Sequence, residues 1–192
     1  MAQVVGFSGS PSRPSKTRAL VTSVAEAIGD QIAADARVFD LLDLGPSWAM
    51  ASRLDDLDMT ARAAVDSVLG ADVLIVGSPV YKAAYAGMFK HFFDLLPPDS
   101  LAGKLVCLTA TGGSERHALV IEQHMRPLFS FFCSVTLPTG IFATDKDFQA
   151  TEIVSDNVRE RVEAAVREAA YLMSPALTPA ARTPRLIASS AQ

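Results

Sequence analysis

The stretch from Val4 to Thr17 constrains the fold more than any other, because three local patterns follow one another in it without a break. It begins with a short apolar run that ends at Gly9, which is typical of a buried strand. A loop dense in hydroxyl and basic side chains comes next. From about Thr17 the apolar residues recur with the spacing of one helix face, at Leu20, Val21, Val24 and Ile28. We therefore predict a strand, a polar loop and a helix N-terminus in direct succession.

The polar loop has the composition of an anion site. The first N–H groups of a helix have no acceptor within the helix, and the helix dipole adds partial positive charge there. The candidate phosphate ligands are Ser10, Ser12, Arg13, Ser15, Lys16 and Thr17. The loop has neither the G-x-x-x-x-G-K-[ST] nor the G-x-G-x-x-G spacing. A capped helix start beside an ordinary polar loop is the alternative interpretation.

Length and composition fit a single domain with a substantial core, since the chain has 192 residues. We assign residues 1–173 to this domain. Residues 174–192, rich in Ala, Pro and Ser, are assigned to a C-terminal tail that is a loose arm or an extension over a neighbouring subunit. Hydrophobic residues make up 49% of the chain, yet no run is long enough to span a membrane. We expect the surplus in the core and in a subunit interface.

Charge and cysteine usage exclude several function classes. A net charge of −4 argues against nucleic acid as the main partner. No charged leader precedes the first apolar run, so we expect no signal peptide and a cytoplasmic protein. Cys107 and Cys133 lie in apolar surroundings and are expected to be buried free thiols. The three histidines form no zinc signature, so no metal site is predicted.

Strands and helices alternate along the rest of the chain. Apolar runs predict strands at residues 36–41, 73–77, 105–109 and, as one interrupted strand, 135–137 and 141–143. Helices are predicted at about 60–69, 86–96, 115–132 and 157–173, with an irregular segment at 42–58. This alternation predicts an α/β fold whose parallel sheet is covered by helices on both faces. Five strands with an anion loop after the first favour a flavodoxin-like, doubly wound sheet of order 2-1-3-4-5.

In that order the carboxyl ends of strands one, three and four open on one crevice, where such folds bind ligands. The first of these ends is the polar loop. The second consists of Pro79, Val80, Tyr81 and Lys82. It offers a rigid turn, an aromatic ring and backbone donors that suit the edge of a flat heteroaromatic ring. The third consists of Thr111, Gly112, Gly113 and Ser114. It lets the backbone approach closely and precedes a helix, whose N–H groups favour negative charge on a reduced ring. A phosphate at one end and a planar redox ring at the other describe FMN.

Four stretches carry a resemblance to a known family. They are Gly9-Ser10-Pro11 with Arg13-Pro14-Ser15, then Ser78 to Gly87 with Lys90 and Asp94, then Ala110 to Leu119, and finally Arg126 to Phe132. Over about residues 3 to 172 the chain resembles the NAD(P)H-dependent FMN reductases of flavodoxin-like fold. The motif Ser114-Glu115-Arg116-His117 and the fourth stretch resemble the branch that serves alkanesulfonate and methanesulfonate utilisation.

The resemblance implies the reductase of a two-component system. NAD(P)H would reduce FMN, and a partner flavin-dependent monooxygenase would use the reduced FMN to cleave a carbon–sulfur bond. Ser10, Arg13, Ser15 and Thr17 would hold the FMN phosphate, and residues 79–82 and 111–114 would contact the isoalloxazine ring. Family members form homodimers or homotetramers. The branch has a π-bulge in the helix after the Gly-Gly loop, often marked by Tyr or His, and the corresponding segment here is Glu122-Gln123-His124, with Gln123 at the aromatic position.

Two other functions stay open at this point. One is a flavoprotein that keeps its FMN and reduces quinones, azo dyes or metal oxyanions, and the other is a non-enzymatic flavin electron carrier. No catalytic acid or base is predicted, because hydride transfer needs alignment of the two rings rather than a general base. Tyr81 and Tyr85 either stack on a ring or pack in the fold, and Arg116 and Arg126 are candidates for attracting the NADPH phosphate. The sequence does not choose between NADH and NADPH or between dimer and tetramer.

Overall fold

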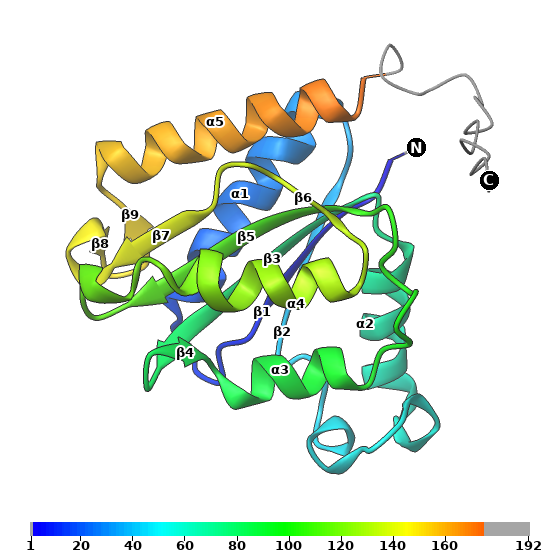
Figure 1. Ribbon diagram of the computed structural model, residues 1–192. Coiled ribbons are helices and arrows are strands. Elements are labelled where there is room, and N and C mark those ends of the chain that lie inside the picture. The colour runs from blue at the N-terminus through cyan, green and yellow to red at the C-terminus, as the bar shows by residue number, and fades with distance from the viewer. Residues whose placement is uncertain (1, 175–192) are drawn as a thin grey trace, which may run out of the picture.

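The computed structural model describes residues 2–174 and has a mostly parallel sheet at its centre (Figure 1). The strands run in the order β2-β1-β3-β5-β6, with β7 also beside β5. Their bounds are β1 Val4–Ser8, β2 Ala36–Asp40, β3 Val73–Tyr81, β5 Leu105–Gly112, β6 Val135–Thr136 and β7 Ile141–Thr144. Because β6 and β7 are the two halves of the predicted interrupted strand, the flavodoxin-like order 2-1-3-4-5 is confirmed.

Helices cover both faces of this sheet, as predicted (Figure 1). Two helices lie on one face, and they are α1 (Lys16–Ile32) and α5 (Asp156–Leu172). Three lie on the other face, and they are α2 (Met59–Gly70), α3 (Gly87–Asp94) and α4 (Arg126–Phe131). Side chains alternate between these layers, so that Val4 packs with α1 and α5 whereas Phe7 packs with α2, α3 and α4. The predicted apolar face of α1 is completely buried.

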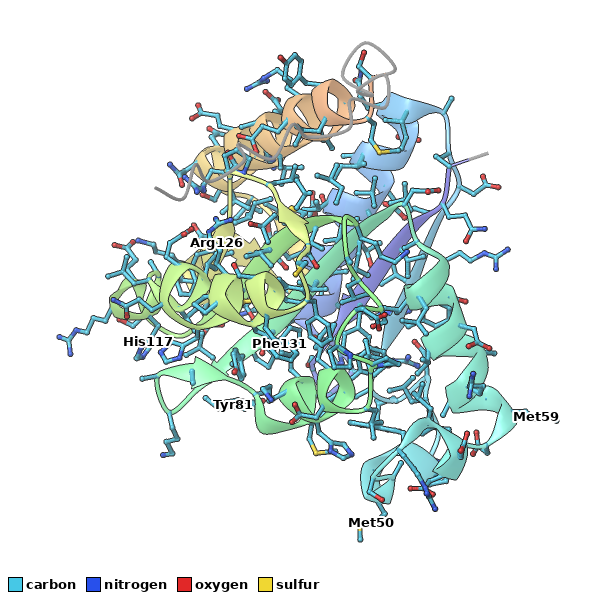
Figure 2. The ribbon with its side chains drawn as sticks, turned by 45° about the vertical axis from the view of Figure 1, so that its right-hand side comes forward. Met50, Met59, Tyr81, His117, Arg126 and Phe131 are labelled. Atoms are coloured by element: carbon cyan, nitrogen blue, oxygen red, sulfur yellow. The ribbon has the colours of Figure 1, made fainter. Side chains whose placement is uncertain are left out.

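The segment between β2 and α2 is irregular, as expected, and contains two short 3₁₀ turns, η1 (Ser47–Met50) and η2 (Leu54–Asp56). The buried Trp48 anchors it, since its carbonyl oxygen lies 3.0 Å from Nε2 of His91 on α3. Met50 and Met59 are almost fully exposed at the outer edge of this region (Figure 2).

β3 is longer than predicted, because residues 78–81 continue the strand instead of forming a loop. Pro79 still pairs with β5, and the last two residues of β3 pair with the antiparallel strand β4 (Ala84–Tyr85). Lys82 and Ala83 between them have φ of 51° and 69°. Two successive residues in the left-handed region give a tight hairpin turn. The predicted ring-contact segment is therefore a strand end and a hairpin.

The prediction of one long helix over residues 115–132 is wrong. The segment is divided into a 3₁₀ turn, η3 (Glu115–His117), a π-helix, η4 (Ile121–Met125), and α4. Pro127 explains the change from η4 to α4, because a proline inside an α-helix lacks an N–H and its ring clashes with the carbonyl four residues before it. A wider π turn relieves that clash. The π-bulge implied by the family resemblance is present.

A hairpin of β8 (Phe148–Gln149) and β9 (Glu152–Ile153) was not predicted. A 3₁₀ turn, η5 (Asp145–Asp147), leads into it from β7. Ala150 at its tip has a φ of 56°. A turn with positive φ usually contains Gly, Asn or Asp, and residues 149–152 contain none of these, so the sequence carried no signal for it.

The two cysteines differ from each other. Cys107 is buried in β5, and burial raises the pKa of its thiol to about 12. Cys133 is exposed in the turn after α4, with a φ of 55°, so the expectation that it is buried was wrong. The tail predicted at residues 174–192 lies outside the described residues, apart from Ser174. Within residues 2–174 we find no helix with the length and apolar character needed to cross a membrane.

Candidate functional site

A pocket of about 380 Å³ lies at the carboxyl ends of β1 and β3, and its volume falls in the range of small-molecule sites. It is lined by Ser10, Ser12, Pro14, Ser15, Lys16, Thr17, Pro79, Tyr81, Ala150 and Thr151. The predicted polar loop and the end of β3 therefore meet in one place. The turn between β8 and β9 completes the pocket.

The N-terminus of α1 forms the polar side of this pocket. Ser15 is the N-cap, and its Oγ accepts a hydrogen bond from the Arg18 N–H at 3.1 Å. The N–H groups of Lys16 and Thr17 belong to the first turn and have no acceptor within the helix. The Oγ atoms of Ser10 and Ser12 lie 3.3 Å apart. The pocket thus combines hydroxyl and N–H donors of the kind that bind an anion.

The third predicted segment is joined to this pocket by one contact. The hydroxyl oxygens of Thr17 and Thr111 lie 2.6 Å apart and are buried. After Thr111, a Cβ on Gly112 would lie 3.0 Å from the ring of Phe142, whereas nothing lies within 4 Å of a Cβ on Gly113. Residues 113 and 114 line a second pocket, of about 530 Å³, together with residues of η3 and η5.

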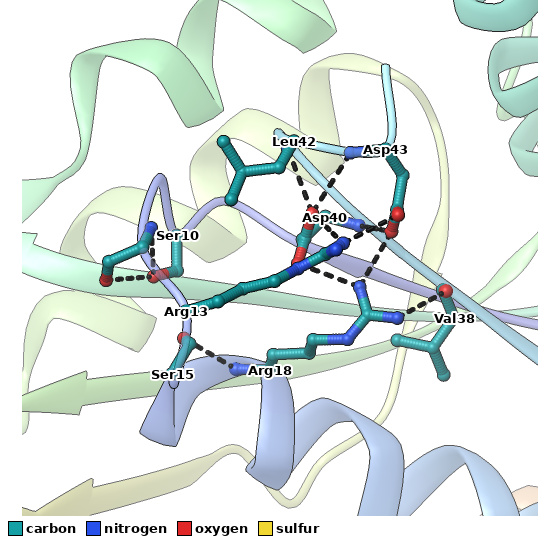
Figure 3. Close-up of polar contacts among 9 residues, drawn as sticks. Ser10, Arg13, Ser15, Arg18, Val38, Asp40, Leu42 and Asp43 are labelled. Atoms are coloured by element: carbon teal, nitrogen blue, oxygen red, sulfur yellow. Dashed lines mark hydrogen bonds and ion pairs between the residues drawn. The ribbon is translucent and has the colours of Figure 1, made fainter. Parts of the chain in front are cut away.

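Arg13 does not point its guanidinium at the pocket, although the sequence predicted a phosphate contact for it. Figure 3 shows its side chain in contact with the carboxylates of Asp40 and Asp43, at and just after the end of β2. Its Nε and Nη2 donate to the two Asp40 oxygens, each at 2.7 Å, and Nη2 donates to Asp43 Oδ1 at 2.6 Å. Arg18 approaches the same two carboxylates at 2.9 and 2.7 Å. Since Asp40 is completely buried, these two arginines supply its charge compensation.

The pKa of Asp43 reflects the charges and hydrogen bonds of this network. Partial burial by itself would raise the pKa of this carboxyl, but hydrogen bonds from Arg13, from the Asp40 N–H and from Arg18 lower it to about 2. The same hydrogen bonds to Asp40 and Asp43 raise the pKa of the Arg13 guanidinium. The four charged groups therefore form a neutral unit that holds the polar loop against β2.

Lys16 is paired with a carboxylate as well. Its Nζ lies 2.7 Å from Oδ1 of Asp145, which is the first residue after β7. The next residue, Lys146, pairs with Glu115 of η3. Two surface ion pairs thus connect the N-terminus of α1, η5 and η3.

On the ring side of the pocket, Tyr81 is 52% exposed and lines the pocket with Pro79. Figure 2 shows Tyr81 on the hairpin that projects from the sheet. Val80 is half-buried, and Lys82 is exposed in the hairpin turn. Tyr85 does not line the pocket and instead packs against Phe89, with ring centroids 5.7 Å apart. Of the two tyrosines, Tyr81 is therefore the candidate for contact with a ligand ring.

Arg126, a candidate for a phosphate contact from sequence, is held inside the fold. Its guanidinium donates to Glu122, to Oγ1 of Thr136 and to the carbonyl oxygen of Leu137. These contacts join the π-helix to the end of β6. Figure 2 shows Arg126 and His117 on separate parts of this region.

Sequence reasoning missed three kinds of site residue. Ala150 and Thr151 line the pocket from an unpredicted hairpin. Asp40 and Asp43 fix Arg13, and Asp145 pairs with Lys16. An acidic residue inside an otherwise largely apolar predicted strand was the available signal for Asp40.

A larger groove, of about 990 Å³, runs between α1 and α5 and shares Pro14, Ser15 and Thr151 with the pocket. Its walls carry charges of both signs, including Glu26, Asp30 and Arg159. We place the site in the smaller pocket, because the carboxyl ends of the parallel strands converge there.

Comparison with known proteins gives consistent matches. The family described as NADPH-dependent FMN reductase matches residues 2–149. An FMN reductase (NADPH) from Pseudomonas aeruginosa is 39% identical over 170 residues, which cover 88% of this chain and 91% of the relative. The NADH-dependent FMN reductase SfnF from Pseudomonas fluorescens is 38% identical over 177 residues, covering 92% and 95%. Among solved structures, the apo form of the NADH:FMN oxidoreductase EMOB has a TM-score of 0.82 at 31% identity and covers 91% of each chain.

Proposed function

This chain belongs to the NADPH-dependent FMN reductase family and is an NAD(P)H:FMN oxidoreductase, and we propose that it supplies reduced FMN to a separate flavin-dependent monooxygenase that desulfonates organosulfonates. The main support for where this reaction takes place is the pocket at the ends of β1 and β3, which has hydroxyl donors on one side and Tyr81 on the other. The sulfonate branch is supported by the family resemblance that the motif Ser114-Glu115-Arg116-His117 carries.

The polar side of the pocket fits the phosphate of FMN. Ser10, Ser12, Ser15 and Thr17 provide hydroxyl groups, and the first turn of α1 provides N–H groups and the positive end of its dipole. Ser8, at the end of β1, is completely buried, and its hydroxyl has no hydrogen-bond partner within residues 2–174.

The other side fits a planar ring. Bound FMN supplies the isoalloxazine ring that accepts the hydride from NAD(P)H. Pro79 and Tyr81 would hold one edge of that ring, and Gly112 and Gly113 would let the backbone at the end of β5 and just after it approach the ring. N–H groups after Gly113 would favour negative charge on the reduced ring. The chain contributes alignment and an electrostatic environment, and no acid or base is needed.

Self-association is part of the proposal. Leu119, Phe131 and Val135 are exposed apolar side chains on the segment from η3 to β6, and Phe131 is 63% exposed (Figure 2). We infer that these side chains are covered by a second copy of the chain. A homodimer or homotetramer that buries them fits the high hydrophobic content of the chain. Because NAD(P)H is an intracellular reductant, the proposal places the enzyme in the cytoplasm.

The first experiment is steady-state oxidation of NADH and of NADPH by the purified full chain, with and without FMN, FAD or riboflavin. We expect colourless protein whose turnover requires added FMN, and the two nicotinamides then give the coenzyme preference. Transfer to a partner is tested by adding a sulfonate monooxygenase and measuring sulfite release under limiting reductase.

Other outcomes would redirect the proposal. A yellow protein that reduces a quinone without added flavin would favour a reductase that keeps its FMN. No oxidation with any flavin would contradict the enzyme function and leave an electron carrier.

A further inference from the structure

The pocket proposed to take the phosphate carries little charge. Among the described residues that line it, Lys16 is the only charged one. Its side chain is 34% exposed, and its ammonium is already 2.7 Å from the carboxylate of Asp145. A phosphate that enters this pocket therefore meets a cation that has a partner.

Arg13 does not supply a replacement charge. Its guanidinium makes a two-pronged contact with Asp40, whose side chain is completely buried (Figure 3). If Arg13 left, a buried carboxylate would lose its main partner, which is costly. We therefore expect Arg13 to stay in its network when an anion binds to the loop.

Lys16, by contrast, can change partners. Asp145 is 72% exposed, and a pair at such a surface shifts an equilibrium by no more than about fivefold. The lysine charge sits on a flexible four-carbon stem, so the ammonium can turn from Asp145 toward a phosphate. The carboxylate then stays close to the phosphate and repels it. Competition for Lys16 and repulsion both act against binding.

We propose that Asp145 sets the flavin affinity of this site, by pairing with Lys16 and so weakening the binding of the FMN phosphate. The inference rests on the proposed function and deepens it, because a reductase that hands its product to another enzyme needs a flavin that exchanges. Serine, threonine and backbone donors would bind the phosphate, and Asp145 would limit the affinity for FMN so that the flavin can dissociate.

The test compares FMN with riboflavin, which has the same ring and no phosphate. Equilibrium binding to the full chain is measured by quenching of flavin fluorescence. We expect Asp145→Asn to tighten FMN binding by about two- to fivefold and to leave riboflavin binding unchanged. Adding Lys16→Met to this variant should remove the gain.

Glu115→Gln is the matched control, because it makes the same change in net charge at a nearby carboxylate that pairs with Lys146 instead. We expect it to leave both dissociation constants unchanged. The inference is overturned if Asp145→Asn leaves FMN binding unaltered. It is also overturned if riboflavin binding changes by the same factor as FMN binding, because Asp145 would then act through the shape of the loop.

Failure of the proposed function looks different. Wild-type chain that binds neither flavin would contradict the flavin site itself. Wild-type chain that prefers FMN over riboflavin, together with an unresponsive Asp145→Asn variant, would overturn the role of Asp145 alone.

Discussion

The hydroxyl oxygens of Thr17 and Thr111 lie 2.6 Å apart, although 94 residues separate them in the chain. Thr17 belongs to the first turn of α1, and Thr111 lies near the end of β5. Both side chains are buried. Their contact fixes the helix that begins at the polar loop against the segment proposed to approach the flavin ring. The shape of the site therefore depends on a buried side-chain hydrogen bond as well as on strand pairing.

This contact predicts a non-additive pair of substitutions. Thr111→Val keeps the shape and removes the partner of the Thr17 hydroxyl, so we expect it to lower the free energy of unfolding by about 1–2 kcal/mol. The double variant with Thr17→Val should lose less than the sum of the single losses, because replacing both partners by apolar groups of the same shape is nearly neutral. Urea unfolding of the three variants measures this. Strictly additive losses would show that the two hydroxyls do not interact.

Gly77 lets α1 approach the sheet below this contact. A Cβ there would lie 2.3 Å from Cγ2 of Val21 and 2.7 Å from Oγ1 of Thr109. We expect Gly77→Ala to push α1 outward, to cost about 1–3 kcal/mol of stability, and to weaken FMN binding because the N-terminus of α1 moves. Gly87→Ala is the control, since nothing lies within 4 Å of its Cβ. Equal urea midpoints for the two variants would contradict the close approach.

The elements that were predicted well are those whose burial leaves a periodic pattern. β1, β2, α2 and α5 begin and end within one or two residues of the expected positions, and α1 begins one residue before its expected start. β3 and β5 run further than predicted, because their last residues include Pro79 and Gly112. Such residues have low strand propensity, and they are held extended by pairing of Pro79 with Thr111 of β5 and of Gly112 with Thr144 of β7. Local sequence does not report that pairing.

The same distinction applies to the site. Strand order alone predicts that the three polar strand ends meet, because they share one edge of a parallel sheet. The ion pairs depend on separations of 27 residues for Arg13 with Asp40 and 129 residues for Lys16 with Asp145. No periodicity connects residues so far apart. Only the structure could therefore show that Arg13 and Lys16 are already paired with carboxylates.

Asp43 gives the arginine network a pH dependence. Its pKa is lowered from 3.8 to about 2 in the fold. A carboxyl with a depressed folded-state pKa contributes stability that is present above about pH 4 and is lost as the pH falls toward about 2. We expect wild-type protein to lose on the order of 1 kcal/mol more than Asp43→Asn across that interval, a small figure because solvent screens this partly exposed group. Urea unfolding at several pH values measures it, and parallel pH profiles would show that Asp43 is not stabilised by the arginines.

Tyr81 is predicted to act on the ring of the flavin and not on its phosphate. Tyr81→Leu should therefore weaken FMN and riboflavin binding by the same factor, about three- to tenfold. Stability should hardly change, because Tyr81 is half-exposed. Tyr85→Leu is the contrasting variant: its ring packs against Phe89, so it should lower the unfolding free energy. A Tyr81 effect confined to FMN would contradict the assignment.

Phe131 tests the proposed self-association. It exposes 63% of its surface at the end of α4, while Phe129 two residues earlier is completely buried in the core. Phe131→Asp would place a charge in an apolar interface, where desolvation without a partner is unfavourable by several kcal/mol. We expect size-exclusion chromatography with light scattering to show a shift toward the monomer mass. Met59→Asp is the control, because Met59 is almost fully exposed on a different part of the surface (Figure 2). If both variants keep the wild-type mass, the interface lies elsewhere, and a wild-type chain that is monomeric at all concentrations would contradict self-association.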